Sequence, residues 1–302
     1  MRKELQESLQ TSPYAERLTV VTTGSYGRRE ASDLSDLDYY LFFDADLPGD
    51  EAIPDEQSLI AEIVNKHVPG SVGDTGTFGH DAIADFKEMI TNIGGLQDTN
   101  QLMTRRMLFL LEGDWLYNES RFNDYRRRLL GKYLREDARP DAIPLFLLND
   151  IIRYYRTITT DLEHKVTTQG KSWGLRNIKL RFSRKMLYFG GIIVAAELVG
   201  QNHQPRIDEA GRLFSMPVIE RIQHLSDADQ AREILQIYDG FLADMASEAV
   251  RRELEGVQRE NRWQSGHYNR LRESGHDFSR ALNTWLKGHY AEAHPIHQAL
   301  IF

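Results

Sequence analysis

Two aspartates separated by one residue are the feature of this sequence that most directly suggests chemistry. Asp36 and Asp38 lie at the start of an apolar run, 38–43 (DYYLFF), that is typical of a β-strand. Alternate strand residues point to the same face, so the two carboxylates would lie side by side, roughly 6–7 Å apart at the backbone. Adjacent carboxylates repel each other unless a cation lies between them, and Mg²⁺ binds one or two carboxylates together with phosphates and water. The pair therefore predicts a hard-cation site.

A Gly-Ser pair precedes the aspartates and ends another strand-like run. Residues 18–23 (LTVVTT) are rich in β-branched side chains, and Gly24 and Ser25 follow them directly. Glycine lets a phosphate approach backbone N–H groups, and the Ser25 hydroxyl at a helix start would help to hold a polyphosphate. Together with the two carboxylates, this loop predicts a metal-dependent nucleotide site.

Simpler interpretations of the same residues exist. Aspartates near the start of a strand are often solvated turn residues, and motif matches include false positives. Arg28 and Arg29 could form surface ion pairs with Glu30 or Asp33, and such pairs are common and weak.

The order of these residues resembles a known signature. The segments Gly24-Ser25, Gly27-Arg28-Arg29 and Ser35-Asp36-Leu37-Asp38, followed by an apolar strand, resemble the signature of the DNA polymerase β-type nucleotidyltransferase superfamily. Within that superfamily, residues 24–43 are most similar to the head of bacterial PII uridylyltransferase-like proteins. The runs 92–116 and 173–188 are similar to uncharacterised bacterial proteins that carry this head, and the weaker likeness extends through about residue 200.

The resemblance implies a role for each matched residue. Gly24 and Ser25 would hold the β- and γ-phosphates of an NTP, and Arg28 or Arg29 would add positive charge against them. Asp36 and Asp38 would be catalytic residues that ligate two Mg²⁺ ions, which activate an attacking hydroxyl and stabilise the pyrophosphate leaving group.

A third carboxylate from a later strand would complete this metal site. The stretch 75–86 (TGTFGHDAIADF) is the expected third strand, and Asp74, Asp81 and Asp85 lie in the right region. Asp81 is the favoured catalytic and metal-binding residue because it lies nearest the middle of that strand. If none of the three serves, the head would bind a nucleotide without turning it over.

The composition limits the setting of this site. The chain has 302 residues, of which 41% are hydrophobic, and it contains no cysteine, which excludes disulfides, thiolate zinc sites and cysteine nucleophiles. Its net charge of −8 gives no general attraction to nucleic acid or to an anionic membrane. The N-terminus lacks the apolar stretch of a signal peptide, and the most apolar window, 190–199, is too short to span a bilayer. We expect a cytoplasmic protein with no membrane partner.

A local basic segment departs from this acidic average. No acidic residue occurs over 164–196, which contains Lys165, Lys171, Arg176, Lys179, Arg181, Arg184 and Lys185. In a helix, an apolar stripe of Leu175, Ile178, Phe182, Met186 and Phe189 would separate these bases into two flanks. We expect Arg176 and Lys179 to face the active-site cleft of the nucleotidyltransferase and to hold a nucleotide or acceptor phosphate. The alternative is that the basic side chains extend their stems along a packed helix.

These patterns predict two domains and an α+β fold class. Residues 1–137 would form a small mixed-sheet nucleotidyltransferase head, and residues 138–302 an all-helical C-terminal domain that binds substrate or nucleotide. The proline-containing segment 135–144 is the expected boundary. Helices are predicted over 99–116, 119–134, 143–165, 171–199, 206–224 and 228–255, while 256–276 is expected to be a loop or a weak helix.

The function expected from these features is a Mg²⁺-dependent nucleotidyltransferase. It would transfer NMP from an NTP to an acceptor hydroxyl or phosphate and release pyrophosphate. The acceptor could be a protein, an RNA end, a nucleotide or a small molecule, and the sequence leaves the oligomeric state open. The alternative is a catalytically silent nucleotide-binding module that regulates a partner, in a toxin–antitoxin or phage-defence setting.

Overall fold

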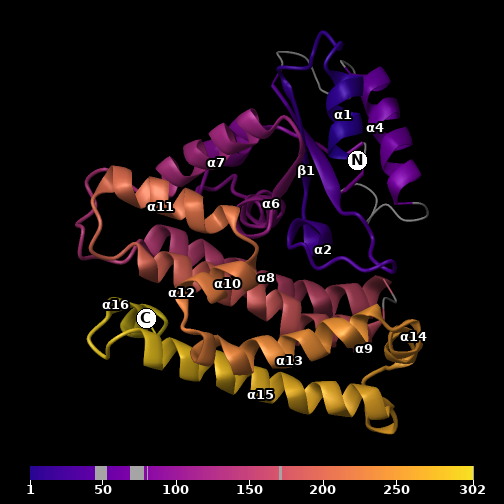
Figure 1. Ribbon diagram of the computed structural model, residues 1–302, viewed down its shortest axis with the longest axis vertical. Coiled ribbons are helices and arrows are strands. Elements are labelled where there is room, and N and C mark those ends of the chain that lie inside the picture. Colours follow the sequence, from indigo (N-terminus) through magenta and orange to yellow (C-terminus); the bar gives the residue numbers. More distant parts are fainter. Residues whose placement is uncertain (45–52, 69–77, 80, 170–171, 302) are drawn as a thin grey trace. The chain divides into compact units, whose positions relative to one another are not determined.

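The computed structural model describes residues 1–44, 53–68, 78–79, 81–169 and 172–301 (Figure 1). The chain forms two compact units. One consists of Met1–Ala31 and Ser35–Arg135, and the other of Ser32–Leu34 and Glu136–Phe302. The protein is 67% helical and also contains a small mixed sheet of four strands. The fold class is therefore α+β.

The first unit is built around this sheet. Its strands are β1 (Leu18–Thr22), β2 (Tyr39–Phe43), β3 (Ile83–Ala84) and β4 (Asp114–Tyr117), in the order β3-β2-β1-β4. β1 is antiparallel to both β2 and β4, whereas β3 runs parallel to β2. Every residue of β1 and β2 is buried, as expected for β-branched and aromatic strands with a packed layer on each face.

Alternate residues of β2 belong to two different cores. Leu37 and the odd-numbered residues of β2 pack with α1 (Arg2–Leu9) and α4 (Pro54–His67), and Figure 1 shows both helices beside β1. Phe42 faces the other way, into an aromatic cluster from α5 (Phe86–Thr91), α6 (Asn100–Leu111) and α7 (Glu119–Tyr133). The partners of Phe42 in this cluster are Phe86, Phe109 and Tyr125, and Phe122 packs on Phe109.

The helix predicted over 99–116 is wrong at its C-terminal end. α6 ends at Leu111, and β4 begins at Asp114. A Cβ at Gly113 would lie 2.3 Å from the carbonyl oxygen of Phe109, so only glycine permits this tight turn. The turn returns the chain along β1 and leaves Glu112 at the end of α6.

The described regular structure of the second unit is helical. Its elements are α8 (Leu145–Gln169), α9 (Trp173–Lys179), the π-helical turn η1 (Leu180–Arg184), α10 (Lys185–Glu197), α11 (His203–Ser215), α12 (Val218–Leu225), α13 (Ala228–Ala246), α14 (Glu248–Gly256), the 3₁₀ turn η2 (Arg262–Gln264), α15 (Gly266–His289) and α16 (Pro295–Ala299). The helix predicted over 171–199 corresponds to α9, η1 and α10 in direct succession. Those predicted over 206–224 and 228–255 are each divided in two, at Pro217 and at Ser247, which caps α14.

The expectation of a loop or weak helix over 256–276 is wrong for most of that range. Residues from Gly266 onward begin α15, one of the longest helices of the chain. Its first turn is capped by the Ser265 hydroxyl, which accepts a hydrogen bond from the Tyr268 N–H at 3.0 Å. One face is apolar and buried, with Tyr268, Leu271, Phe278, Leu282 and Trp285 at helical spacing. The polar residues lie on the other faces of α15. Their number made the segment resemble a loop in composition.

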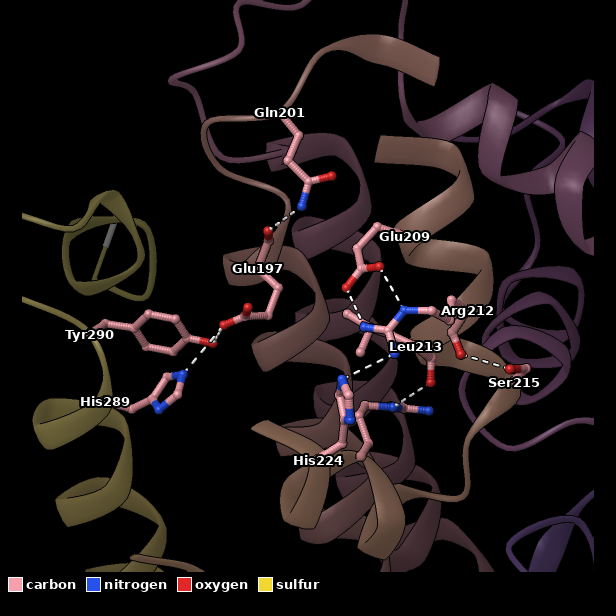
Figure 2. A network of polar contacts seen from close by, with 10 residues as sticks. Glu197, Gln201, Glu209, Arg212, Leu213, Ser215, His224, His289 and Tyr290 are labelled. Atoms are coloured by element: carbon pink, nitrogen blue, oxygen red, sulfur yellow. Dashed lines mark hydrogen bonds and ion pairs between the residues drawn. The ribbon is translucent and has the colours of Figure 1, made fainter. Parts of the chain in front are cut away.

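A half-buried carboxylate, Glu197, joins the C-terminal end of α15 to α10 (Figure 2). The Tyr290 hydroxyl donates to Glu197 Oε1 at 2.7 Å, and His289 Nε2 lies 3.5 Å from the same oxygen. Beyond them, His294 Nδ1 accepts from the Ile296 N–H, and His297 Nε2 contacts the Tyr290 carbonyl oxygen. These histidine contacts are therefore made with backbone groups.

Removing the Tyr290 hydroxyl should measurably weaken this anchor. Tyr290 is buried and its hydroxyl donates to a carboxylate, so Tyr290→Phe should lower the free energy of unfolding by about 1.5–3 kcal/mol. Urea unfolding followed by circular dichroism measures the change. Tyr14→Phe removes a hydroxyl from a partly buried tyrosine in the first unit and is the matched control. Equal effects of the two substitutions would contradict the prediction.

No helix in the described residues is both long and apolar enough to cross a membrane.

Candidate functional site

The pairing of β1 with β2 brings the two sequence motifs together. Thr22, the last residue of β1, is in register with Tyr39, the first residue of β2. Just beyond this pair, the Asp38 carbonyl oxygen accepts from the Thr23 N–H at 2.9 Å and from the Thr22 hydroxyl at 3.0 Å. The backbone of Asp38 is thus fixed to the residue that precedes Gly24.

Gly24 lies directly beside the Asp38 side chain. A Cβ added to Gly24 would be 2.7 Å from Asp38 Oδ2, and the backbone has a φ of +67°, in the left-handed region. Both constraints require glycine. The structure therefore brings together Gly24 and Asp38, two residues that the sequence singled out independently.

Asp36 and Asp38 lie on the same side of the chain. Leu37 between them is fully buried in the core with α1 and α4, while Asp36 is exposed and Asp38 is half-buried. Burial that alternates in this way places both aspartates on the face opposite Leu37. β2 begins at Tyr39, so the aspartates immediately precede the strand, whereas the sequence placed them on it.

Ser25 lies in a single helical turn, α2 (Gly24–Gly27). It is half-buried, and its carbonyl oxygen accepts from the Glu30 N–H at 2.8 Å, which closes the loop that follows. One turn has too few aligned peptides to provide a helix macrodipole, so any phosphate contact here would depend on individual N–H and hydroxyl groups. Gly27 packs so closely that its Cβ would lie 2.2 Å from the Glu112 carbonyl oxygen.

Arg28 is buried between two carboxylates. Its Nε donates to Glu30 Oε2 at 2.7 Å, and its Nη1 donates to Glu112 Oε2. Glu112 is also buried, and its other oxygen accepts from the Gly24 N–H at 3.0 Å. The simpler interpretation, a surface ion pair between Arg28 and Glu30, is correct about the partner. It is wrong about the location, because both side chains are buried. Charge neutralisation by two carboxylates leaves little positive charge on Arg28 to offer a phosphate.

Glu112 is a residue of this site that sequence reasoning missed. It is distant in sequence from both Gly24 and Arg28, and it follows the apolar run 107–111 directly. One feature of the sequence could have indicated this residue. Glu112 is a lone acidic residue between an apolar run and Gly113.

The proposed third carboxylate, Asp81, is exposed and lies in a turn before β3. The parallel register of β2 with β3 pairs Leu41 with Ile83, and continuing it by two residues sets Asp81 opposite Tyr39. The negative charge of Asp81 acts on the Tyr39 hydroxyl. Burial and this charge together raise the pKa of Tyr39 to about 12. Tyr39 belongs to the core with α1 and α4, on the face opposite Asp38.

Asp85 and Asp74 are the other two candidates for the third carboxylate. The Asp85 side chain caps α5 by accepting from the Lys87 N–H at 2.7 Å. Asp74 lies outside the described residues, as does most of the expected third strand. Of that strand, β3 occupies Ile83–Ala84.

The chemistry of the side chains at this site suits a hard cation such as Mg²⁺. Asp36 and Asp38 supply carboxylate oxygens on one side of the chain, which are the ligands that Mg²⁺ prefers. Among the residues that the structure describes, no group of three or more His, Asp or Glu side chains has a metal-binding arrangement. The described residues thus offer a two-carboxylate site, with room for further ligands from substrate and water.

Arg176 and Lys179 lie in the second unit, on α9, and both are half-buried. The predicted apolar stripe of this segment is confirmed, because Leu175, Ile178, Phe182, Met186 and Phe189 are all buried. A role of Arg176 and Lys179 in holding phosphate stays a prediction.

No protein-family model matches the chain, and no curated protein is significantly similar to it. The nucleotidyltransferase interpretation therefore depends on the motif residues themselves and on the way the first unit assembles them.

A substitution at Gly24 tests this assembly. Gly24→Ala places a Cβ 2.7 Å from Asp38 Oδ2 at a residue with positive φ, so we expect a loss of about 1–3 kcal/mol in the free energy of unfolding. Gly131→Ala in α7 is the control, because a Cβ there meets nothing within 4 Å and alanine favours the helix by about 0.5–1 kcal/mol. Urea unfolding of both variants gives the comparison. A neutral or stabilising Gly24→Ala would show that the glycine is not required.

Proposed function

We propose that the first unit is a Mg²⁺-dependent nucleotidyltransferase head that transfers NMP from an NTP to an acceptor hydroxyl or phosphate. The observation that supports this most is the placement of the Asp38 carboxylate against the Gly24 backbone, with Asp36 on the same side of the chain. A carboxylate pair beside a glycine, which has no Cβ between its backbone and the carboxylate, suits a metal–triphosphate substrate.

Each side chain has a distinct part in this proposal. Asp36 and Asp38 would hold Mg²⁺, which supplies charge for the departing pyrophosphate and lowers the pKa of an attacking hydroxyl. The Gly24 backbone would lie along the phosphates, with the Ser25 hydroxyl as an additional donor. Arg28 would act by position, because its bonds to Glu112 and Glu30 fix the turn that carries Gly24 and Ser25.

The third carboxylate and the acceptor are the less supported parts of the proposal. Asp81 would need to reach the Asp38 side of the sheet from the turn before β3, while its charge acts on Tyr39 on the other side. Arg176 and Lys179 would hold the phosphate of the nucleotide or acceptor. A protein, an RNA end, a nucleotide and a small molecule all remain candidate acceptors.

A catalytically silent nucleotide-binding module is the second candidate function. It is favoured by the placement of Asp81 beside Tyr39 and by the neutralisation of Arg28, which together leave two carboxylates and little positive charge at the loop. Such a module would bind a nucleotide and act on a partner, as a regulatory or toxin–antitoxin component does.

One experiment separates these two functions. The full chain is incubated with each of the four labelled NTPs, with Mg²⁺ or with EDTA. Each mixture also contains an acceptor of one candidate class (a protein, an RNA end, a nucleotide or a small molecule), and pyrophosphate release and NTP binding are followed in parallel. Mg²⁺-dependent pyrophosphate release supports the transferase, and nucleotide binding without release supports the silent module. If no NTP binds, both proposals are wrong.

A further inference from the structure

Two half-buried cations in the second unit lie next to each other, and no carboxylate of the described residues pairs with either of them. Arg181 is in the π-helical turn η1, and Lys185 begins α10 one turn later. Among the described residues, neither forms an ion pair, and the contacts that hold them are with neutral groups. On neighbouring α15, by contrast, Arg270 is paired with Asp244 and Arg280 with Asp277.

The neutral contacts place both cations along α15. Lys185 Nζ donates to Ser279 Oγ at 2.5 Å, and the Ser279 hydroxyl donates in turn to the Gly275 carbonyl oxygen at 2.7 Å. Gly275 also leaves space for the Arg181 stem, because a Cβ there would lie 3.3 Å from Arg181 Cβ. Small residues one turn apart on α15 thus lie opposite cations one turn apart on η1 and α10.

Further polar groups border Arg181. Its Nε donates to Asn177 Oδ1 at 2.9 Å, and the Tyr268 hydroxyl donates to the same oxygen at 3.0 Å. On the α8 side, Tyr155 stacks on Tyr188 with ring centroids 4.5 Å apart, and the charge of Arg181 acts on Tyr155. The neighbours from α8, α9 and α15 are therefore hydroxyl and amide groups.

This arrangement is electrostatically unfavourable without an anion. Burial and the positive charge of Arg181 both lower the pKa of Lys185, and no carboxylate raises it. Like charges that are half-buried together reduce stability unless a counter-charge neutralises them. The described hydrogen bonds use one of the three Lys185 N–H donors, and Arg181 bonds to Asn177 and to the Tyr268 hydroxyl, so both side chains have further donors to offer.

We propose that Arg181 and Lys185 form a binding site for a phosphate group. A phosphate carries about −1.5 to −2 charges at pH 7, which compensates both cations, whereas a carboxylate compensates only one. The planar Arg181 guanidinium binds two phosphate oxygens, and the Lys185 ammonium acts as a point charge on the third. This site uses other cations of the basic segment than Arg176 and Lys179, and it does not depend on the nucleotidyltransferase proposal.

Calorimetric titration of the full chain with inorganic phosphate, without Mg²⁺ or NTP, tests the site. We expect saturable binding that Lys185→Met and Arg181→Gln each weaken about tenfold or more. Lys287→Met removes an exposed lysine from α15 with the same change in charge, and it should bind as the wild type does. Acetate should bind much more weakly than phosphate. Absence of phosphate binding by the wild type, or equal binding by Lys185→Met, would overturn the proposal.

Two more measurements separate a binding role from a structural one. At alkaline pH, phosphate should raise the pKa of Lys185, so binding should take up protons and its enthalpy should vary with the buffer in the wild type but not in Lys185→Met. Without phosphate, Lys185→Met should unfold at a higher temperature than the wild type, because it removes one of two repelling cations. A lower unfolding temperature together with unchanged proton uptake would assign Lys185 a purely structural role.

The outcome is independent of the first unit. The double variant Asp36→Asn with Asp38→Asn should bind inorganic phosphate as the wild type does. In that variant, AMP can also be compared with inorganic phosphate, and tighter binding of AMP would identify a nucleotide as the source of the phosphate group. Loss of phosphate binding in the double variant would show that phosphate binding depends on the first unit and would overturn the proposal.

Discussion

Replacing Asp36 and Asp38 together by asparagine is expected to reduce Mg²⁺-dependent pyrophosphate release by on the order of 10³-fold or more. The two side chains are the carboxylates that the structure places on one side of the chain next to Gly24. Without their negative charge, Mg²⁺ loses both carboxylate ligands beside Gly24, and the stabilisation of the leaving pyrophosphate is lost. Release of labelled pyrophosphate from the preferred NTP measures the effect.

The controls for this prediction use aspartates of the same region. Asp33→Asn changes an exposed aspartate nearby in sequence and should leave the rate unchanged. Asp81→Asn tests the third carboxylate directly. A large loss of rate would place Asp81 in the metal site, while an unchanged rate would agree with its position beside Tyr39. Turnover that survives the double substitution would contradict the two-carboxylate mechanism, provided that circular dichroism shows the variant folded.

The sequence predicts the central part of the first unit because its signals are local. β1 and β2 are runs of β-branched and aromatic residues, and the polar loop between them contains the glycines and aspartates of the site. β4 escapes prediction because it is short and follows a helix without an obvious break. Its start depends on the close approach of Gly113 to Phe109, a constraint that appears only in the folded backbone.

The long helix α15 shows the opposite difficulty. Its composition is polar and includes Gly266 and Gly275, which suggests a loop. Its buried face is nevertheless regular, and the helix is stabilised mainly by packing of that face. Gly275 has a packing reason, since Arg181 occupies the space beside it. Tertiary contacts of this kind override local propensity and are not visible in a single sequence.

The same distinction applies to the candidate site. The proximity of Gly24 and Asp38 follows from the antiparallel pairing of β1 with β2, the two strands that the sequence predicts on either side of the loop. The partner of Arg28 does not follow, because Glu112 is 84 residues further along the chain. The side of the sheet on which Asp81 lies depends on the register of β3 against β2, and no local pattern sets that register.

Glu112 contacts both the buried Arg28 and the Gly24 backbone of the candidate site. We therefore expect Glu112→Gln to destabilise the first unit strongly. The substitution keeps the size of the side chain but leaves the buried Arg28 with Glu30 as its remaining acidic partner in this group. Removing one member of a buried ion pair costs about 3–5 kcal/mol, and the contact with Glu30 puts our expectation near 3 kcal/mol. Urea unfolding measures the loss, and Glu88→Gln, which changes an exposed side chain on α5, is the control.

A triple substitution shows whether these buried charges are needed for stability or for the site. In Arg28→Met with Glu30→Gln and Glu112→Leu, uncharged side chains of similar size replace all three buried charges, and such replacements are often neutral or stabilising. We expect this variant to regain most of the stability lost in Glu112→Gln. It also removes the acceptor of the Gly24 N–H, so the loop should no longer be fixed and NTP binding should weaken. Restored stability together with wild-type NTP binding would show that the Arg28–Glu112 pair does not position Gly24 for phosphate.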